Sequence, residues 1–306
     1  MCNGEKYVKE YSHGDDRGHV QAMVYRPFPG VEVAFASVHM AEFDFGFWEQ
    51  GNEERDVTIH YCKEGRMEQQ TQEEFFYLMP GDCAFDAHQK QQKLFQLPLK
   101  HYQGICITMD LERMENPLLA YLHSCGCSPD DVLGQRSCVV LRSSEGAKKF
   151  FEDLDTVESE QKLHYLRVKI PELFYRIKCA KTDSSYYDRD LVPRYQVEIV
   201  QSASDYILKN LNRKITVKQL TRHFGVSDTY LQNAFRSVYG MPVIRFIRMQ
   251  KMQRAAQVLI HTTRTIDEIA EEFGYENESK FATAFKKIMG ESPGAYRKAR
   301  SKVKIP

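Results

Sequence analysis

The sequence predicts an α+β protein in which an antiparallel β-barrel or sandwich comes before a helical hairpin and an all-α unit. Three observations support this order. Apolar residues alternate over residues 25–110, recur every three or four positions from residue 144, and form a repeated helical pattern after Tyr195. The 306 residues suffice for about two domains of usual size. An apolar share of 42% beside 27% charged residues is typical of globular chains and excludes a fully disordered one.

The first unit is predicted over residues 1–143 from period-two patterns. Val31, Val33 and Phe35 alternate with other residues, and residues 57–61 and 75–79 do the same. Pro80-Gly81-Asp82 is a turn signal, because proline presets φ and glycine accepts positive φ. Many short strands separated by turns indicate a small antiparallel barrel or sandwich.

Residues 144–180 are predicted to form a helical hairpin. Two stripes carry apolar residues at helical spacing: Ala147, Phe150, Phe151 and Leu154, then Leu163, Leu166, Ile170, Leu173 and Ile177. The strict 3-4-3-4 spacing of the second stripe is typical of a two-helix contact. Two interpretations stay open: the stripe packs on the unit's own sheet, or it forms a dimer interface. Pro171 removes one backbone donor and should kink this helix.

Residues 181–193, KTDSSYYDRDLVP, show no apolar period and end in proline, so we interpret them as a linker to a unit at 194–306. The net charge of zero conceals a split. From Pro193 onward there are 20 Lys+Arg and 10 Asp+Glu, whereas residues 1–192 contain 22 and 32. This charge asymmetry favours a carboxyl-terminal unit that binds a polyanionic partner. The alternative is two solvated surfaces that merely differ in charge.

The carboxyl-terminal unit contains an internal duplication. Residues 215–242 read ITVKQLTRHFGVSDTYLQNAFRSVYGMP, and residues 264–293 read RTIDEIAEEFGYENESKFATAFKKIMGESP. Phe224 and Gly225 match Phe273 and Gly274 at an offset of 49, and Phe235 matches Phe285 at 50. Each copy is predicted to be a helix, a glycine turn and a second helix, at about 216–238 and 265–289.

Both copies contain helix-start signals. Thr216 with Gln219, and Thr265 with Glu268, have the spacing of a capping box, in which each side chain satisfies the other residue's backbone N–H. Polar side chains are expected to be exposed on the helices. Predicted base-reading residues are Thr229, Gln232, Asn233, Arg236, Ser279, Lys280 and Thr283, and predicted phosphate-contacting residues are Thr216, Ser227, Lys218, Thr265, Asn277, Lys286 and Lys287.

Chemistry motivates these two sets. Asparagine and glutamine amides match adenine, arginine and lysine match guanine, and capped helix starts suit phosphate oxygens. A helix over residues 242–260 would be about 28 Å long. One turn of B-DNA is about 34 Å, so two reading helices joined in this way suit successive major grooves. The alternative is a pair of ordinary helical hairpins packed on each other.

The stretch TIDEIAEEFGYENESKFATAFKKIMGESPGAYR resembles the signature of the AraC/XylS-type transcription regulators, and the resemblance covers about residues 195–300. It implies bacterial transcription control through double-stranded DNA, with the helices at 227–238 and 277–289 as readers. The stretches YCKEGRMEQQ, YLMPGDCAFDA and HYQGICITMDLERM are similar to members with a cupin-like sensor barrel and a dimerisation hairpin. The resemblance further implies a homodimer, a small-molecule effector and RNA polymerase as a partner.

Enzymatic alternatives are weighed against these patterns. His39, His60, His88 and His101 lie in or near the strands, but no His-x-His pair occurs, so we predict neither a metal, a cofactor nor an enzyme. A cupin-fold metal enzyme with a helical appendage remains the alternative. His123, Cys125 and Cys127 would suit a soft metal or a thiol-based sensor.

The predicted effector pocket is lined by aromatic residues of the barrel: Trp48, Tyr61, Phe76 and Phe85. Plain core packing is the alternative for each of them. No 18-residue apolar window and no secretory signal is found, and the irregular spacing of eight cysteines indicates reduced thiols. We therefore expect a cytoplasmic protein that does not contact a membrane.

Overall fold

The structure is a computed structural model. It describes residues 7–15, 18–44, 56–70, 74–87, 94–111, 116–133, 138–142, 145–180, 192–213 and 215–300. The chain divides into two compact units, Met1–Leu191 and Val192–Pro306, and each is described by itself. Most of the predicted linker, residues 181–191, lies outside the described residues.

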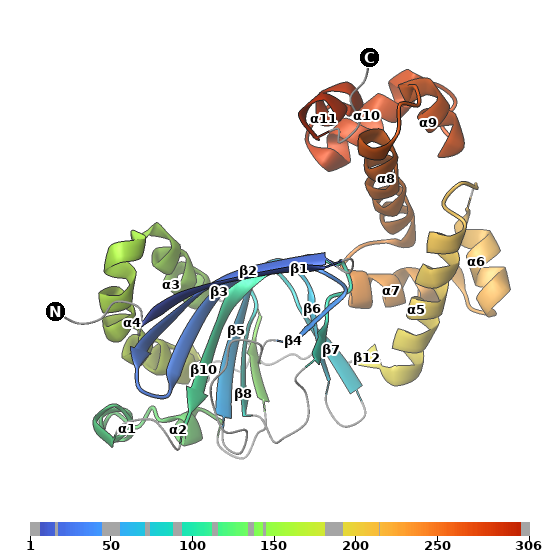
Figure 1. The fold of residues 1–306 in the computed structure, drawn as a ribbon. Helices are drawn as coiled ribbons and strands as arrows, with labels where there is room; N and C mark the ends of the chain where they lie inside the picture. The colour runs from blue at the N-terminus through green and yellow to red at the C-terminus, as the bar shows by residue number, and fades with distance from the viewer. Residues whose placement is uncertain are drawn as a thin grey trace. The chain divides into compact units, whose positions relative to one another are not determined.

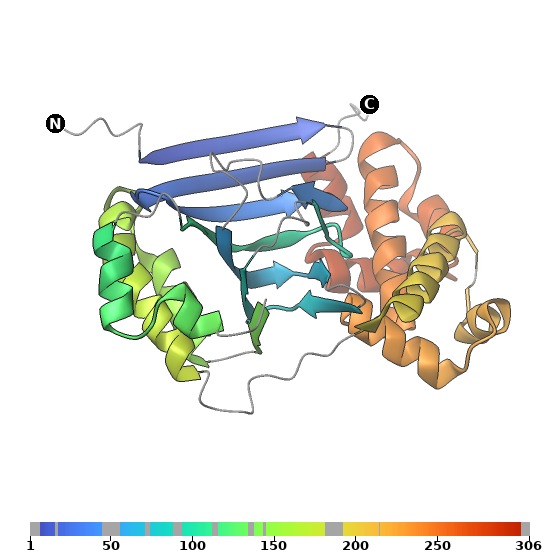
Figure 2. The same cartoon turned by 90° about the horizontal axis from the view of Figure 1, so that it is seen from below.

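A curved seven-stranded antiparallel sheet forms the centre of the first unit (Figure 1). Its strand order is β1-β2-β3-β10-β5-β8-β11, and strands β1–β3 lie side by side at one edge (Figure 2). The strands are β1 (Val8–Asp15), β2 (Gly18–Phe28), β3 (Val31–His39), β5 (Asp56–Gly65), β8 (Cys83–Ala87), β10 (Tyr102–Asp110) and β11 (Cys138–Leu141). The alternation of Val31, Val33 and Phe35 therefore belongs to a real strand, because successive side chains point to opposite faces.

Two short antiparallel pairs complete the strands of this unit. They are β4 (Glu42–Asp44) with β9 (Leu94–Gln96), and β6 (Met67–Gln70) with β7 (Glu74–Leu78). The described strands do not hydrogen-bond into one closed barrel. Alternation predicts which face each side chain takes, whereas closure depends on twist and on irregularities such as the register shift between Gln103 and Gly104.

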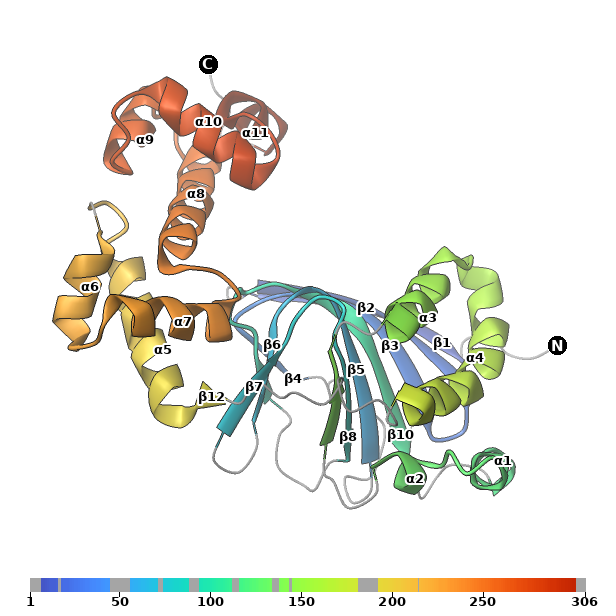
Figure 3. The same ribbon diagram turned by 180° about the vertical axis from the view of Figure 1, so that it is seen from behind.

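Helices cover one face of the large sheet (Figure 3). They are α1 (Asn116–Ser124), α2 (Pro129–Leu133), α3 (Glu145–Thr156) and α4 (Ser159–Ala180). In α4, four residues of the 3-4-3-4 stripe are buried against strand residues such as Val33 and Ile107: Leu166, Ile170, Leu173 and Ile177. This packing answers the open question about the stripe, because these side chains are covered by their own chain. The helix continues through Pro171.

The opposite face of the sheet packs against the short strand pairs. Val24, Ala34 and Cys106 of the sheet join Phe43 and Met67 in a second buried cluster. The first unit is thus layered: helices, the large sheet, and the short strands. Burial of two apolar faces explains why strands β3 and β10 are apolar on both sides.

The second unit is helical. Strand β12 (Val192–Pro193) precedes α5 (Arg194–Lys209), α6 (Val217–Phe224), α7 (Asp228–Tyr239), α8 (Val243–His261), α9 (Ile266–Glu272), α10 (Glu278–Met289) and α11 (Pro293–Arg300). Helix α8 contacts α7 as well as α9, α10 and α11, and it links the two duplicated halves (Figure 1). Its buried residues include Phe246, Met252, Ala255 and Leu259.

Candidate nucleic-acid interface

The first copy of the duplication, α6 and α7, begins with the predicted capping box. The Gln219 backbone N–H donates to the Thr216 hydroxyl at 3.3 Å, and the Thr216 N–H donates to the Gln219 side-chain oxygen at 2.9 Å. At the start of α7, the Ser227 hydroxyl accepts from the Tyr230 N–H at 3.1 Å. These bonds satisfy donors that a helix start leaves open. Gly225 between the helices has φ +66, a conformation that glycine adopts without strain.

The second copy, α9 and α10, repeats this construction. The Thr265 N–H donates to the Glu268 carboxylate at 2.7 Å, which holds the pKa of Glu268 below its usual value. The Asn277 side-chain oxygen accepts from the Lys280 N–H at 2.9 Å at the start of α10. Gly274 lies in the turn with φ +76. The capping pattern in the sequence therefore locates both helix starts correctly.

The exposed ridge of α7 consists of Thr229, Asn233 and Arg236, spaced four and three residues apart. The Arg236 guanidinium donates to the Asn233 side-chain oxygen at 3.2 Å, so these two polar ends lie together. Gln232 does not belong to this ridge. Its side-chain oxygen accepts from the Val243 N–H at 3.3 Å, where α8 begins. The amide predicted to read bases is half-buried at the α7–α8 junction, so we propose that it acts there instead.

The matching ridge of α10 follows from the offset of 50. Ser279, Thr283 and Lys286 occupy the positions of Thr229, Asn233 and Arg236, and all three are exposed. The Thr283 hydroxyl donates to the Ser279 carbonyl at 2.9 Å. Lys280 is exposed and forms an ion pair with Glu276, an exposed contact of the kind that contributes little stability. Lys286, predicted from sequence to contact phosphate, thus lies at the position equivalent to Arg236.

The predicted phosphate-contacting residues lie around these ridges. Thr216, Ser227, Thr265 and Asn277 use their side-chain oxygens as helix caps, and this leaves backbone N–H groups of the first turns directed outward along each helix axis. Lys218 and Lys287 are exposed. Helix α8 between the two copies has 19 residues, which corresponds to about 28 Å.

The aromatic residues predicted to form an effector pocket are not brought together. Tyr61 stacks on Phe151 of α3 with ring centroids 4.2 Å apart, and Phe85 meets Phe174 of α4 edge-on at 5.8 Å. Phe76 is buried in the cluster on the opposite face of the sheet. Trp48 lies outside the described residues. Tyr61, Phe76 and Phe85 are core residues, as the plainer alternative held.

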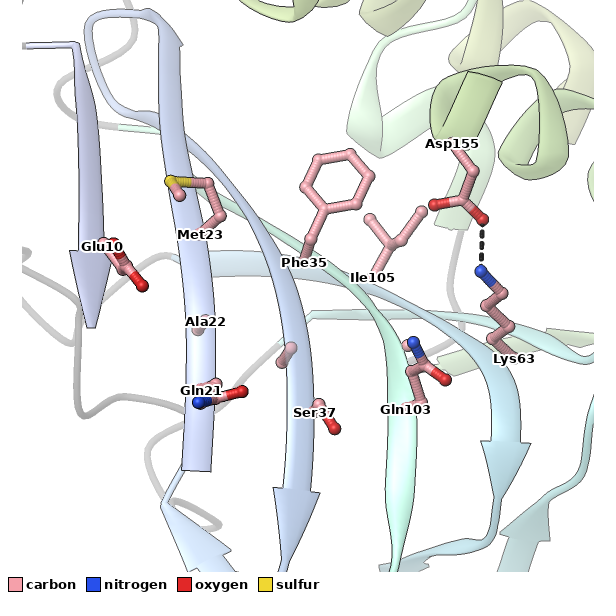
Figure 4. A pocket seen from close by; sticks show the side chains of 12 residues that line it. Glu10, Gln21, Ala22, Met23, Phe35, Ser37, Lys63, Gln103, Ile105 and Asp155 are labelled. Atoms are coloured by element: carbon pink, nitrogen blue, oxygen red, sulfur yellow. Dashed lines mark hydrogen bonds and ion pairs between the residues drawn. The ribbon is translucent and has the colours of Figure 1, made fainter. Parts of the chain in front are cut away.

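A cleft that the sequence did not indicate lies on the helix-covered face of the sheet, beside the end of α3 (Figure 4). Its volume is about 270 Å³. The register places its polar residues Gln21, Ser37 and Gln103 opposite one another on β2, β3 and β10, next to a row of Met23, Phe35 and Ile105. Alternation alone could have identified these rows, but which part of the face the helices leave uncovered depends on tertiary packing.

An ion pair closes one end of the cleft. The Lys63 ammonium lies 2.6 Å from the Asp155 carboxylate of α3, and both side chains are partly exposed (Figure 4). The Lys162 ammonium of α4 lies over the Phe35 ring at 4.5 Å from the centroid, and burial lowers its pKa. Among the lining residues Asp155 belongs to α3, and Phe35 is in contact with Lys162 of α4.

The histidines and cysteines do not converge on one point. His39 stacks on His19 at 4.5 Å and meets His101 at 4.7 Å between ring centroids, while His60 is buried against Phe95 on the other face. His88 lies outside the described residues. Within the described ranges, no group of three or more potential ligands could hold a metal ion.

The His123, Cys125 and Cys127 cluster lies at the end of α1. Cys125 is exposed, whereas Cys127 is 2% exposed. Burial raises the pKa of the Cys127 thiol and the nearby Cys125 adds to this effect, so thiolate formation is disfavoured there. Throughout the described part of the chain, every helix is too short or too polar to cross a membrane.

Comparison with known proteins places the duplicated unit in a family. A helix-turn-helix domain model matches residues 220–299. The chain is 39% identical over 99 residues to the F1 operon positive regulatory protein of Yersinia pestis. This match covers 32% of this chain and 33% of that protein. It is 30% identical over 104 residues to the HTH-type transcriptional activator AarP of Providencia stuartii, covering 34% of this chain and 77% of AarP.

A solved structure matches the same region. The carboxyl-terminal domain of the response regulator AraT from Geobacillus stearothermophilus is 35% identical, with a TM-score of 0.34, and the match covers 35% of this chain and 90% of that domain. The chain thus spans only a third of the Yersinia regulator but three quarters of the Providencia activator. The duplicated helix-turn-helix sequence, its capping geometry, the domain model and the two relatives from Yersinia and Providencia show that the chain belongs to the AraC/XylS-type transcription regulators.

Proposed function

We propose that this protein is a transcription regulator that binds double-stranded DNA through α7 and α10. The observation that carries the proposal is the pair of equivalent exposed ridges, Thr229–Asn233–Arg236 and Ser279–Thr283–Lys286, on two capped helices. Arginine and lysine match the guanine edge, and asparagine matches adenine, in the major groove. The names of the Yersinia and Providencia relatives, a positive regulatory protein and a transcriptional activator, support the same role.

Backbone contacts would come from the surroundings of these ridges. Lys218 and Lys287 are exposed, and the helix starts at Ser227 and Asn277 present N–H groups to phosphate oxygens. The excess of basic residues after Pro193 supports a polyanionic partner. Because α8 is about 28 Å long, the two ridges suit major grooves about one helical turn apart.

Binding by the full chain tests this function directly. Duplexes selected from a random library would be measured by gel shift at several salt concentrations, followed by protection mapping of the best site. We expect affinity to fall steeply with salt and two protected segments about one turn apart. A salt-independent affinity, or a single short protected segment, would contradict the proposal.

We propose the outer face of α4 as the contact with a second copy of the chain. Because the 3-4-3-4 stripe is covered by the sheet, a dimer must use other residues. Val168 is 70% exposed and Tyr175 is 59% exposed, and their spacing of seven places them on one stripe with Pro171. Large apolar side chains exposed together favour burial by a partner.

We propose the cleft beside α3 as the effector site, in place of the aromatic set predicted from sequence. Its apolar row and its amide and hydroxyl row suit a small molecule with one apolar and one polar side. A ligand that displaces Lys63 from Asp155 would act on α3 and thereby on the hairpin. Under this proposal the sheet and hairpin, residues 1–180, sense and dimerise, residues 194–306 bind DNA, and contact with RNA polymerase stays a prediction.

A further inference from the structure

Lys251, near the middle of α8, is a buried cation between the two halves of the second unit. The residue is 8% exposed. Its ammonium donates to the Phe273 carbonyl at 2.8 Å and to the Arg213 carbonyl at 3.1 Å. These acceptors lie 22 residues after and 38 residues before Lys251 in the sequence. One side chain therefore joins three segments that are distant in the chain.

One of the two carbonyls belongs to the second copy of the duplication, and the other lies just before the first copy. Phe273 is the C-cap of α9, directly before the Gly274 turn that leads to α10. Arg213 lies in the segment between α5 and α6, which leads into the first copy. Helix α8 is the element that connects the copies (Figure 1). The Lys251 ammonium bonds to a carbonyl in the second copy and to one just before the first copy.

The chemistry of this contact makes it sensitive to backbone position. A buried ammonium needs hydrogen-bond acceptors, and a helix C-terminus offers carbonyls that carry partial negative charge. Within the described residues, no ion pair links Lys251 to a carboxylate, and its ammonium donates to the two backbone oxygens instead. Backbone acceptors cannot rotate away as carboxylates can, and the bonds hold only while the two segments keep their distances from α8. Burial lowers the pKa of Lys251.

We propose that Lys251 is a positioning residue that sets the spacing between the two DNA segments this protein accepts. The inference rests on the proposed function and deepens it. One base pair added between two segments moves them apart by about 3.4 Å and rotates them by a tenth of a turn. A pair of reading helices with a firmly held separation accepts one spacing, whereas a loosened pair accepts several with lower affinity for each.

The test compares full-length wild-type protein, Lys251→Met and the control Lys209→Met. Methionine keeps an apolar stem but removes the donors, and Lys209 is an exposed lysine at the end of α5. The duplexes are the best wild-type site and versions with one base pair inserted or deleted between its protected segments. We expect wild type and Lys209→Met to lose about tenfold in affinity on the altered spacings. Lys251→Met should bind the original site about tenfold more weakly and distinguish the spacings by less than about threefold.

A second measurement uses the wild-type chain alone. Acylation of lysine amines followed by mass spectrometry should show Lys251 reacting at least about tenfold more slowly than Lys209, because its ammonium is buried and bonded. Circular dichroism checks the fold of each variant. If Lys251→Met does not fold, Lys251→Leu, which also removes the donors, replaces it in the binding series.

The outcomes separate this inference from the proposed function. If Lys251→Met, or Lys251→Leu in its place, discriminates spacing as wild type does, or if Lys251 is acylated as fast as Lys209, the positioning role is overturned and DNA binding stands. If wild-type protein binds no duplex, the proposed function fails, while slow acylation of Lys251 would still support its buried contact with the Arg213 and Phe273 carbonyls.

Discussion

The side-chain oxygen of Gln232 accepts a hydrogen bond from the Val243 N–H at 3.3 Å. Val243 is the first residue of α8, and its N-cap Pro242 provides no side-chain acceptor. The amide of Gln232 therefore satisfies a donor at a helix start that otherwise lacks a cap. A residue on the second helix of the first copy thus stabilises the helix that connects the copies.

We expect Gln232→Ala to lower the free energy of unfolding by about 1 kcal/mol, as loss of a capping acceptor does, without changing base preference. Thermal melting and competition binding among single-base variants of the best site measure the two effects. Gln201→Ala, at an exposed position of α5, is the control. An unchanged melting temperature together with relaxed base preference would restore the role that the sequence suggested.

Removal of a ridge residue should relax discrimination in its own half of the DNA site. Arg236→Ala is expected to reduce the free-energy preference for the preferred base by about 1–3 kcal/mol in one protected segment. Lys286→Ala is expected to have the same effect in the other segment. Binding to a library of site variants measures this for each substitution. Loss spread equally over both segments would argue against equivalent roles for the two residues.

Lys287 is expected to act on affinity alone. Its exposed ammonium lies next to the α10 ridge, so Lys287→Ala should weaken binding to all sequences alike and reduce the salt slope by about 1. Gel shifts at several salt concentrations on the best site and on unrelated duplex measure it. A change confined to the best site would instead identify Lys287 as a base reader.

Val168→Glu should dissociate the dimer that we propose, because a carboxylate would replace an apolar side chain on the outer stripe of α4. Analytical ultracentrifugation measures the mass, with Lys149→Glu on the exposed side of α3 as the matched control. Ile170→Ala, on the buried stripe, is expected to cost about 2–4 kcal/mol of stability while the dimer persists. Dissociation by Lys149→Glu and not by Val168→Glu would place the interface elsewhere.

Acid should destabilise the first unit through His39. Partial desolvation lowers the pKa of His39 below its usual value although the side chain is exposed, and the neighbouring His101 and His19 lower it further. The Glu64 carboxylate lies 3.3 Å from Nε2 of His101, the ring that neighbours His39. Because the folded state binds the His39 proton less readily than the unfolded state, the free energy of unfolding decreases as pH falls through 6.5.

The difference in melting temperature between pH 7.5 and pH 5.5 measures this effect. We expect the difference to be smaller in His39→Gln than in wild type, whereas His261→Gln, an exposed position in the second unit, should match wild type. Equal differences in all three proteins would show that His39 does not couple folding to pH.

Much of the second unit was predictable because its signals are local. A capping box, a helix-starting serine or asparagine and a turn glycine act within four residues of one another, so Thr216 with Gln219 and Thr265 with Glu268 locate their helices without tertiary information. Period-two alternation likewise predicted β3, since neighbouring side chains of a strand point to opposite faces.

By itself, then, the sequence determined the duplication, the helix boundaries, the strand faces and the family. Only the tertiary structure decided which contact a side chain makes when the sequence allows two. The Gln232 side chain bonds to the start of α8, Tyr61 and Phe85 are buried under the hairpin, and the sheet covers the α4 stripe. Lys251 bonds to one carbonyl in the second copy and to one just before the first copy. The reason is physical: these contacts join segments far apart in the chain, and burial between packed elements depends on how those elements meet rather than on the spacing within any one of them.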